Sequence, residues 1–381
     1  MRKLKILFIL SITLISCNNK TRNYEKLIVG DWEKVIEKIE ISENSDIIIL
    51  PPRQNRDGNI GYYFAENGVF ENKLGYFGKN KKDSEGRTKS QFLGTQTKYK
   101  IIDDSLETYD LTSNKWENVK IDKLTKDSLI LEYKDKSKEK FSKRNYKTAK
   151  VRSFDKIIVS TSGCYGSCPV TDIIISKSGE IIYNGEMYVN KKGLFKSKIS
   201  QEDFLKIQAD FKKANYINLK DEYIANHTDD MTLTVTFIEN NQIIKTITDY
   251  GRESPTELKW AVLPIIFLNQ KIRLEQFKNS KAYIDFGFGD FEKGNEICVL
   301  TKSECFYLSN LLQNCKEENV NFKSKYIIRY WSNDKQKKVE TDGQYYKFQI
   351  ETDKFITLNL GFNFLEKNNL LKRLRNKTEY E

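Results

Sequence analysis

The sequence predicts a β-rich α+β fold, in which an antiparallel barrel is followed by two modules of β-β-α-β-β type. Short strand-like runs separated by turn residues fill residues 61–146, which is typical of a barrel or sandwich. Two later helices each begin with a capping signal, and a hairpin pattern follows each of them. These observations divide the chain into a leader (1–16), a barrel (17–150) and modules at 151–277 and 278–381.

The leader has the pattern of an export signal. A basic start precedes the apolar run Ile6–Ile15, which is too short to cross a bilayer. Leu14-Ile15-Ser16-Cys17 resembles a bacterial lipobox, which implies cleavage before Cys17 and acyl chains that anchor the protein in a membrane. Asn18 does not resemble an inner-membrane retention signal, and residues 18–22 lack the acidic run that resembles a surface-export tag, so we expect the periplasmic face of the outer membrane. The alternative is a secretory signal followed by an unmodified cysteine.

Gly30-Asp31-Trp32 stands at the head of the first strand pattern and resembles the Gly-x-Trp opener of lipocalin-like barrels. The resemblance implies that Trp32 closes the base of the barrel. It also implies that Arg144, in the last strand, stacks on the indole ring by a cation–π contact. Small barrels are either filled by side chains or hold one ligand. We expect a filled barrel, with a cavity for a small apolar ligand as the alternative.

The first module opens with Cys164-Tyr165-Gly166-Ser167-Cys168-Pro169. This hexapeptide resembles the opening of a family of bacterial envelope domains of uncharacterised function. That family continues as a strand pair, a helix and a second strand pair with a Thr-Asp nearby, and the resemblance covers about residues 154–275. Strand-like runs at Val170–Ser176 and Glu180–Tyr183 fit the first pair. The resemblance implies a fold unit and no particular reaction.

Cys164 and Cys168 have three interpretations. The first is a structural disulfide, whose short loop stabilises the fold by roughly 2 kcal/mol at most. The second is a redox pair, which usually needs a helix N-terminus or a cation near the sulfurs; the β-branched run after Pro169 predicts a strand there instead. The third is a metal site completed by His227, similar to that of thioredoxin-like copper chaperones, because two thiolates and an imidazole suit Cu(I) or Zn(II).

The helix of the first module is predicted to begin after Ser200, with Asp203 completing a variant of the capping box. A hairpin of Thr232–Ile238 and Ile243–Thr248 follows it. The last hundred residues resemble a degenerate copy of this plan without the cysteine motif.

In the second module, Thr301 and Glu304 form the capping box. The hairpin that follows is predicted at Tyr326–Trp331 and Lys337–Thr341.

Three further cysteines, Cys298, Cys305 and Cys315, lie in the second module. Disulfides are permitted outside the cytoplasm, and five cysteines after Cys17 leave at least one thiol unpaired within the chain. Cys298 could pair with Cys305 or with Cys315. Cys315 falls on the apolar side of the predicted helix, where a buried free thiol is the simplest interpretation.

The formal net charge is +11, but acidic residues interleave with the basic ones. No basic stripe or nucleic-acid-binding motif is present, so we expect no nucleic-acid partner. A single histidine, no Gly-x-Ser-x-Gly elbow, no Walker loop and no dinucleotide fingerprint leave little for catalysis, and we expect no enzyme activity and no cofactor.

These features predict a lipid-anchored envelope protein that works as a binding or scaffold protein, with an envelope protein as the expected partner. One alternative is a lipocalin-like carrier of a small apolar ligand. The other is a thiol-redox or copper-handling protein that uses Cys164, Cys168 and His227.

Overall fold

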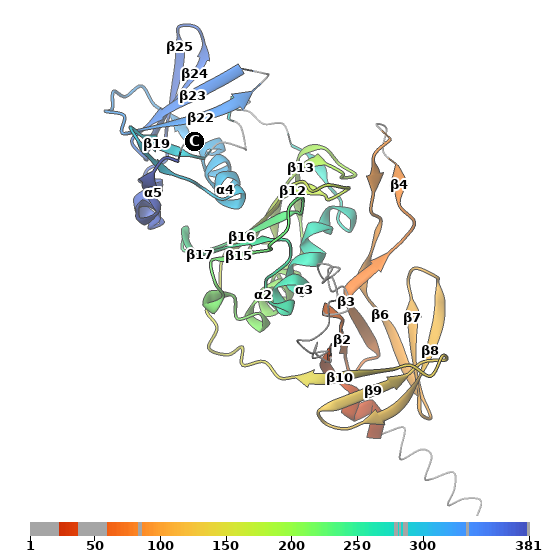
Figure 1. Ribbon diagram of the computed structural model, residues 1–381. Coiled ribbons are helices and arrows are strands. Elements are labelled where there is room, and N and C mark those ends of the chain that lie inside the picture. Colours follow the sequence, from red (N-terminus) through yellow and green to blue (C-terminus); the bar gives the residue numbers. More distant parts are fainter. Residues whose placement is uncertain are drawn as a thin grey trace, which may run out of the picture. The chain divides into compact units, whose positions relative to one another are not determined.

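The computed structural model describes residues 23–36, 59–82, 86–277, 281, 283–284, 289–332 and 335–378. The chain divides into two compact units, one within residues 1–81 and 90–147 and the other comprising residues 82–89 and 148–381. Strands dominate both units, which confirms the β-rich α+β fold class (Figure 1). No helix among the described residues is long and apolar enough to span a bilayer.

The first unit is a closed antiparallel barrel, as the sequence predicts. Its strands follow the cyclic order β1-β10-β9-β8-β7-β6-β3-β2, in which chain neighbours mostly pair with each other. Turn residues with positive φ, such as Asp103 and Asn114, reverse the chain between successive strands. The strands are β1 (Gly30–Lys34), β2 (Gly61–Phe64), β3 (Val69–Phe77), β6 (Phe92–Ile102), β7 (Ser105–Asp110), β8 (Lys115–Leu124), β9 (Ser128–Glu132) and β10 (Lys138–Arg144), and a separate ribbon is formed by β4 (Lys81–Lys82) and β5 (Thr88–Lys89).

The second unit is built on an eight-stranded sheet of order β15-β17-β16-β11-β12-β13-β14-β18. The central strands carry nearly continuous apolar runs because both faces of the sheet are covered. The strands are β11 (Lys156–Thr161), β12 (Val170–Ser176), β13 (Glu180–Met187), β14 (Gly193–Lys198), β15 (Glu222–Ile224), β16 (Thr232–Glu239), β17 (Gln242–Tyr250) and β18 (Glu275–Gln276).

Side-chain alternation assigns the two faces of this sheet. Phe237 points to the side of α2 (Gln201–Lys213), where its ring packs 5.2 Å from that of Phe211. The adjacent Thr236 points to the opposite side, where its hydroxyl lies 2.8 Å from that of Ser303 in α4 (Lys302–Gln313). The helix α3 (Thr256–Ile266) contacts α2, β11 and β12. The sheet is therefore sandwiched between helices.

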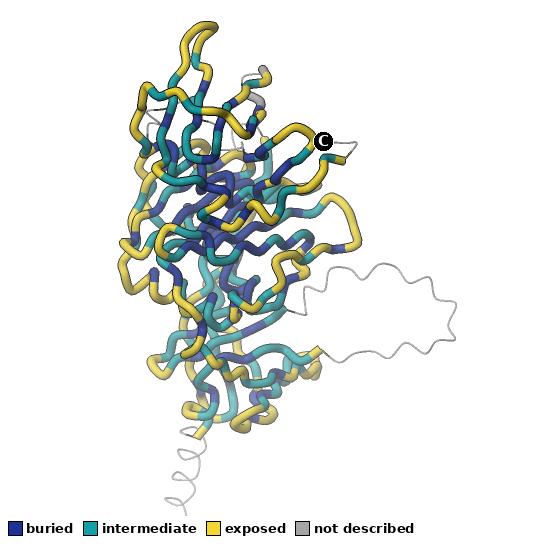
Figure 2. Tube along the Cα trace, turned by 90° about the vertical axis from the view of Figure 1, so that its left-hand side faces the viewer, coloured by how far each residue is buried: buried dark blue, intermediate teal, exposed yellow. Residues whose placement is uncertain are grey.

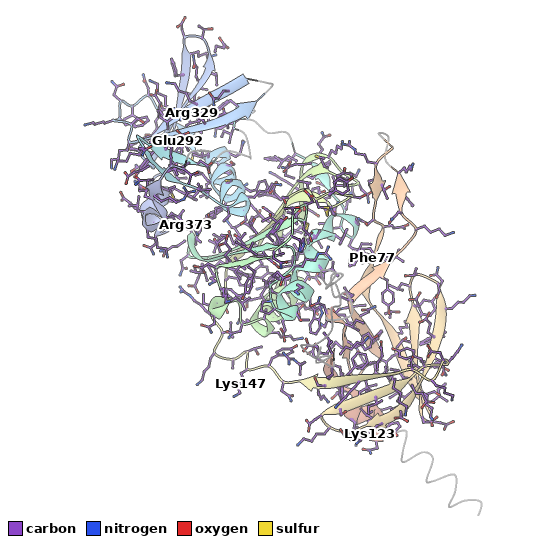
Figure 3. The ribbon with its side chains drawn as sticks, viewed as in Figure 1. Phe77, Lys123, Lys147, Glu292, Arg329 and Arg373 are labelled. Atoms are coloured by element: carbon purple, nitrogen blue, oxygen red, sulfur yellow. A yellow bond between two sulfur atoms is a disulfide. The ribbon has the colours of Figure 1, made fainter. Side chains whose placement is uncertain are left out.

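A second sheet of order β21-β25-β24-β23-β22-β19-β20-β26 follows α4 along the chain. Glu292 of this sheet accepts hydrogen bonds from Arg329 and Lys377. Figure 3 labels Glu292 and Arg329. Its strands are β19 (Phe291–Lys293), β20 (Glu296–Cys298), β21 (Lys316–Glu317), β22 (Tyr326–Ser332), β23 (Lys335–Thr341), β24 (Tyr345–Glu351), β25 (Lys354–Asn359) and β26 (Arg375–Asn376), and the short helix α5 (Phe364–Lys367) precedes β26.

The two predicted modules share one hydrophobic core. Ile158 and Ile174 of the first sheet belong to the same buried cluster as Phe306 of α4 and Tyr346 of the second sheet. Figure 2 shows this concentration of buried residues along the strands, with exposed residues at the turns. The hairpin predicted after each helix is present, as β16–β17 and β22–β23. The sequence pattern does not predict β11 or β14.

Candidate functional site at the disulfide end of the sheet

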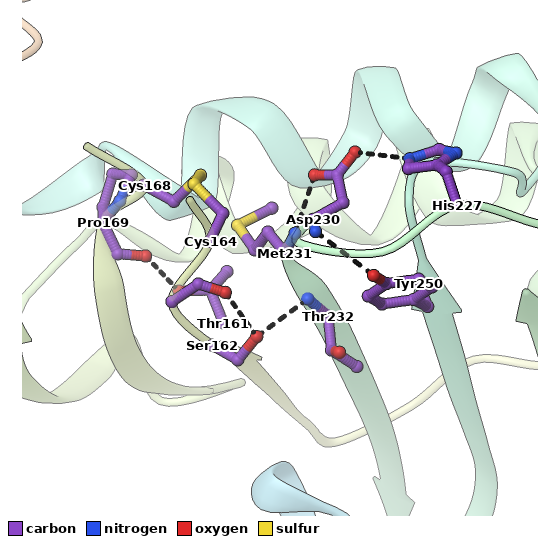
Figure 4. Close-up of a disulfide and its surroundings, with 11 residues drawn as sticks. Thr161, Ser162, Cys164, Cys168, Pro169, His227, Asp230, Met231, Thr232 and Tyr250 are labelled. Atoms are coloured by element: carbon purple, nitrogen blue, oxygen red, sulfur yellow. Dashed lines mark hydrogen bonds and ion pairs between the residues drawn. A yellow bond between two sulfur atoms is a disulfide. The ribbon is translucent and has the colours of Figure 1, made fainter. Parts of the chain in front are cut away.

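The hexapeptide loop lies between β11 and β12, which pair antiparallel at the centre of the sheet. Thr161 holds both of its ends together. The Thr161 hydroxyl donates a hydrogen bond to the Pro169 carbonyl at 2.6 Å and accepts one from the Thr171 backbone at 3.1 Å (Figure 4). The loop is therefore fixed at its base by the sheet itself.

Cys164 and Cys168 form a disulfide, with their Cα atoms 5.7 Å apart. Both cysteines are half-buried, and the Gly166 backbone donates a hydrogen bond to the Cys164 carbonyl within the loop. Pro169 is followed directly by β12, so the strand predicted after the motif is confirmed. No helix N-terminus follows Cys168, which removes the usual means of lowering a thiol pKa at such a pair.

The segment 225–231 supports the disulfide loop from the side. The Tyr165 backbone donates a hydrogen bond to the Asp229 carbonyl at 2.9 Å. Ser162 and Thr232 are linked twice, through the backbone of Ser162 and through its hydroxyl, which accepts from Thr232 at 2.8 Å (Figure 4). These contacts leave the backbone of the loop little freedom to move.

His227 forms a contact that does not involve the sulfurs. Its Nε2 lies 3.2 Å from Asp230 Oδ2, and the Asp230 backbone donates to the Tyr250 hydroxyl at the same distance (Figure 4). A Cβ on Gly251 would lie 3.2 Å from the imidazole, and its φ of +76° also favours glycine. Within the part of the chain that the structure describes, no three His, Cys, Asp or Glu side chains are grouped to hold a metal.

Tyr165, at the tip of the loop, is the residue that sequence reasoning missed. It is 91% exposed, although tyrosine usually packs part of its ring against the protein. Met187, at the end of β13, pairs with Val170 at the base of the loop and is 41% exposed. The available signal was an aromatic residue inside a very short Cys-Cys loop, where its side chain has no room to fold back into a core.

A buried polar cluster lies on the α4 face of the same sheet. Asp172 is 1% exposed, accepts a hydrogen bond from Asn184 at 3.1 Å and lies 3.5 Å from the ammonium of Lys302. Lys302 also contacts Glu186 at 2.7 Å. Burial raises the pKa of Asp172 to about 6, although Lys302 opposes the rise. The cluster joins the N-terminus of α4 to the sheet.

The other three cysteines are free thiols. Cys298 and Cys305 are buried and Cys315 is half-buried, and burial raises the pKa of all three. The pairings of Cys298 with Cys305 or Cys315 are therefore not formed. A raised pKa keeps these thiols protonated and poorly nucleophilic.

Trp32 is fully buried at the base of the barrel, and its Nε1 donates a hydrogen bond to the Ile28 carbonyl at 2.6 Å. The cation over its ring is Lys143, whose ammonium lies 5.2 Å from the ring centroid. Arg144, which we expected in this role, forms an ion pair with Glu33. The register explains the correction, because Trp32 lies opposite Lys143, whereas Arg144 lies opposite Asp31.

Aromatic rings fill much of the barrel interior. The Tyr62 ring lies 4.9 Å from that of Phe141 and 5.2 Å from that of Phe70, and Phe64 lies 5.0 Å from Tyr99. Phe64 and Phe141 are completely buried. This packing favours a filled barrel over one with a ligand cavity. The predicted lipidation site, Cys17, lies outside the described residues.

Residues 155–269 match the family described as "Domain of unknown function (DUF6438)". No curated protein matches the chain. The match begins at β11 and ends after α3, and it contains the disulfide loop together with the segment that supports it. The resemblance expected for residues 154–275 is confirmed to this extent. Residues 155–269 therefore form a DUF6438 domain, a fold unit to which no function is attached.

Proposed function

We propose that the protein is a lipid-anchored, non-enzymatic component of the cell envelope that binds a protein partner through the disulfide end of its DUF6438 domain. The observation that carries this proposal is the exposure of Tyr165 on a covalently closed loop. Tyrosine is enriched among the residues that dominate binding energy at protein interfaces. A loop that is already fixed loses little conformational entropy when a partner binds.

The lipobox resemblance supports the anchored location. An acylated Cys17 would hold the chain at a membrane while the folded units remain in the aqueous phase. Metabolic labelling with an alkyne fatty acid tests this part. The full chain should incorporate the label, and Cys17→Ser should not. Equal labelling of both proteins would refute the anchor without affecting the binding proposal.

Site-specific photo-cross-linking tests the binding proposal. A photoreactive amino acid at position 165 of the full-length chain should give a discrete cross-linked product in the bacterial envelope. The same amino acid at position 206, on the exposed side of α2, is the matched control. A product at position 165 and none at 206 supports the proposal. Equal products at both positions, or none at 165, would reject it.

A carrier role for the barrel is the second candidate, because closed eight-stranded barrels can hold one small ligand. The aromatic packing around Tyr62 and Phe141 weighs against it. Titration with a fluorescent apolar probe tests this candidate. Saturable binding that Phe141→Ala strengthens would indicate a cavity adjoining these rings, whereas no saturable binding to the wild-type chain would exclude the carrier role.

A further inference from the structure

A groove of about 700 Å³ lies on the α4 face of the sheet, at the end opposite the disulfide loop. It is lined by residues of the neighbouring strands β11 to β14, by Asn310 of α4 and by Asn314, the C-cap of that helix. The seven residues of β12 separate the two ends, a distance of about 20 Å at the usual rise per residue. The groove is therefore a site of its own.

Lys156, at one end of the groove, is a half-buried cation. Among the described residues it forms no ion pair with a carboxylate, and its ammonium lies 5.6 Å from the ring centroid of Tyr307. Burial lowers its pKa from the ordinary lysine value, and the charges of Glu180 and Asp155 offset this effect only in part. Burying a charge costs free energy, and an anion bound directly beside Lys156 would recover part of that cost.

Lys196, on β14, is an exposed cation at the other end of the groove. Its ammonium lies 3.9 Å from the ring centroid of Phe277, a cation–π contact that orients the side chain without cancelling its charge. Two carboxylates also line the groove, but each has a cation as its neighbour. Glu180 lies opposite Lys198 and Glu275 lies opposite Lys196 in the strand register, and Glu275 is also 3.9 Å from Arg273. The four cations of the lining, Lys156, Lys196, Lys198 and Arg273, outnumber these two carboxylates by two, so the groove keeps an excess of positive charge for a ligand.

The spacing and the floor define what would fit between these cations. Neighbouring strands lie roughly 4.8 Å apart, so β11 and β14 are about 14 Å from each other. Ile174 and Ile182 form an apolar strip between them. We propose that the groove binds an elongated ligand with an acidic group at each end, one beside Lys156 and one beside Lys196, and an apolar body on the isoleucine strip. The inference requires neither the lipid anchor nor contact through Tyr165.

Isothermal titration calorimetry with simple diacids tests the site. Sebacate carries two carboxylates at the ends of a long apolar chain, succinate carries them close together, and decanoate carries one. Sebacate should bind the full chain at least about tenfold more tightly than either of the others, since one charge-assisted contact contributes roughly 1.5–3 kcal/mol. Octane-1,8-bisphosphonate, measured at the same ionic strength, shows whether phosphonate or carboxylate ends are preferred.

Variants assign the binding to the groove. Lys156→Gln should weaken sebacate binding about tenfold, to the level of decanoate, and Lys206→Gln on α2 should leave it unchanged. Lys196→Gln, at an exposed position, gives the same test if Lys156→Gln does not fold. Equal binding by Lys156→Gln and Lys206→Gln variants would show attraction to the general positive charge and overturn the proposal. No preference for sebacate over succinate and decanoate, or no binding at all, would also overturn it.

Discussion

The helices α2 and α4 begin with the same local signal and lie in different surroundings. Ser200 caps α2 with Asp203 in a capping box, and Thr301 caps α4 with Glu304 in the same arrangement. Only two residues of α2 are buried, whereas nine of the twelve residues of α4 are. The local sequence determines where each helix begins, and the surroundings determine how much each capping residue contributes to stability.

Glu304 shows how the surroundings of α4 differ from those of α2. It is fully buried and receives two hydrogen bonds from Arg373, at 2.8 and 2.9 Å, and one from Thr246 at 2.7 Å. The same carboxylate also accepts from the Thr301 backbone at 3.0 Å. Asp203 on α2 is about half exposed and interacts mainly within its own first turn. One capping position thus links distant parts of the fold, and the other serves its helix alone.

The largest expected effect follows from replacing these two residues. Glu304→Ala should lower the free energy of unfolding by about 3–5 kcal/mol, because it leaves Arg373 and Thr246 without their buried acceptor. Asp203→Ala should cost about 0.5–1 kcal/mol, the usual range for a lost capping contact. Urea unfolding of both variants measures the difference. Equal losses of unfolding free energy in the two variants would contradict the difference described between Glu304 and Asp203.

The pH dependence of Asp172 sharpens the same comparison, because Lys302 links this residue to the start of α4. Its pKa is about 6 in the fold and about 4 in the unfolded chain, so the folded state binds the proton more tightly. Stability should therefore fall as pH rises from about 4 to about 6, by an amount on the order of 2 kcal/mol. Asp172→Asn should remove this component when urea unfolding is measured at both pH values. An unchanged pH dependence in the variant would contradict the assignment.

The N-cap residues themselves should show no such contrast. Ser200→Ala and Thr301→Ala each remove one side-chain acceptor for a backbone N–H, and each should cost about 1 kcal/mol. Similar shifts of the unfolding midpoint in the two variants would show that α2 and α4 differ in stability at the third helical residue, Asp203 or Glu304, and not at the N-cap. A much larger loss for Thr301→Ala would instead show that the burial of the whole first turn is responsible.

The smallest expected effect concerns the barrel, where the pairing register of β1 and β10 determines which cation lies over Trp32. Lys143→Met removes the cation over Trp32 and should cost roughly 0.5–1 kcal/mol. Arg144→Met removes a partly exposed ion pair with Glu33 and should cost less. Thermal unfolding of the two variants ranks them. The reverse order would restore Arg144 as the residue that supports Trp32.

Much of the fold follows from local sequence signals. Capping boxes located both helices, and turn residues separated the barrel strands. The pattern did not predict β11, because its apolar run follows directly on a basic stretch that resembles a linker. It did not predict β14 either, because Gly193–Lys198 is short and half polar. Such strands are stabilised by the neighbours they pair with, which a local pattern does not contain.

The candidate site was predictable only in part. The short spacing made a Cys164–Cys168 disulfide the first interpretation, and the β-branched run that follows Pro169 predicted the strand after it. The burial of Asp172 could not, because it depends on residues distant in the sequence, such as Lys302. The assignment of Lys143 to Trp32 required the pairing register between β1 and β10, and a shift of one residue reverses which side chain faces the interior.

The most direct test of the account separates contact from redox turnover at the disulfide loop. A photoreactive amino acid at position 187, beside the base of the loop, forms a cross-linked product with the bound partner. The yield of this product is compared between the otherwise unchanged chain, the Tyr165→Ala variant and the double cysteine-to-serine variant. The account predicts that Tyr165→Ala removes most of the cross-linked product, and that Cys164→Ser with Cys168→Ser reduces it only partly by loosening the loop. Full loss with the serine variant and a normal yield with Tyr165→Ala would contradict the account and identify the sulfurs as the working groups.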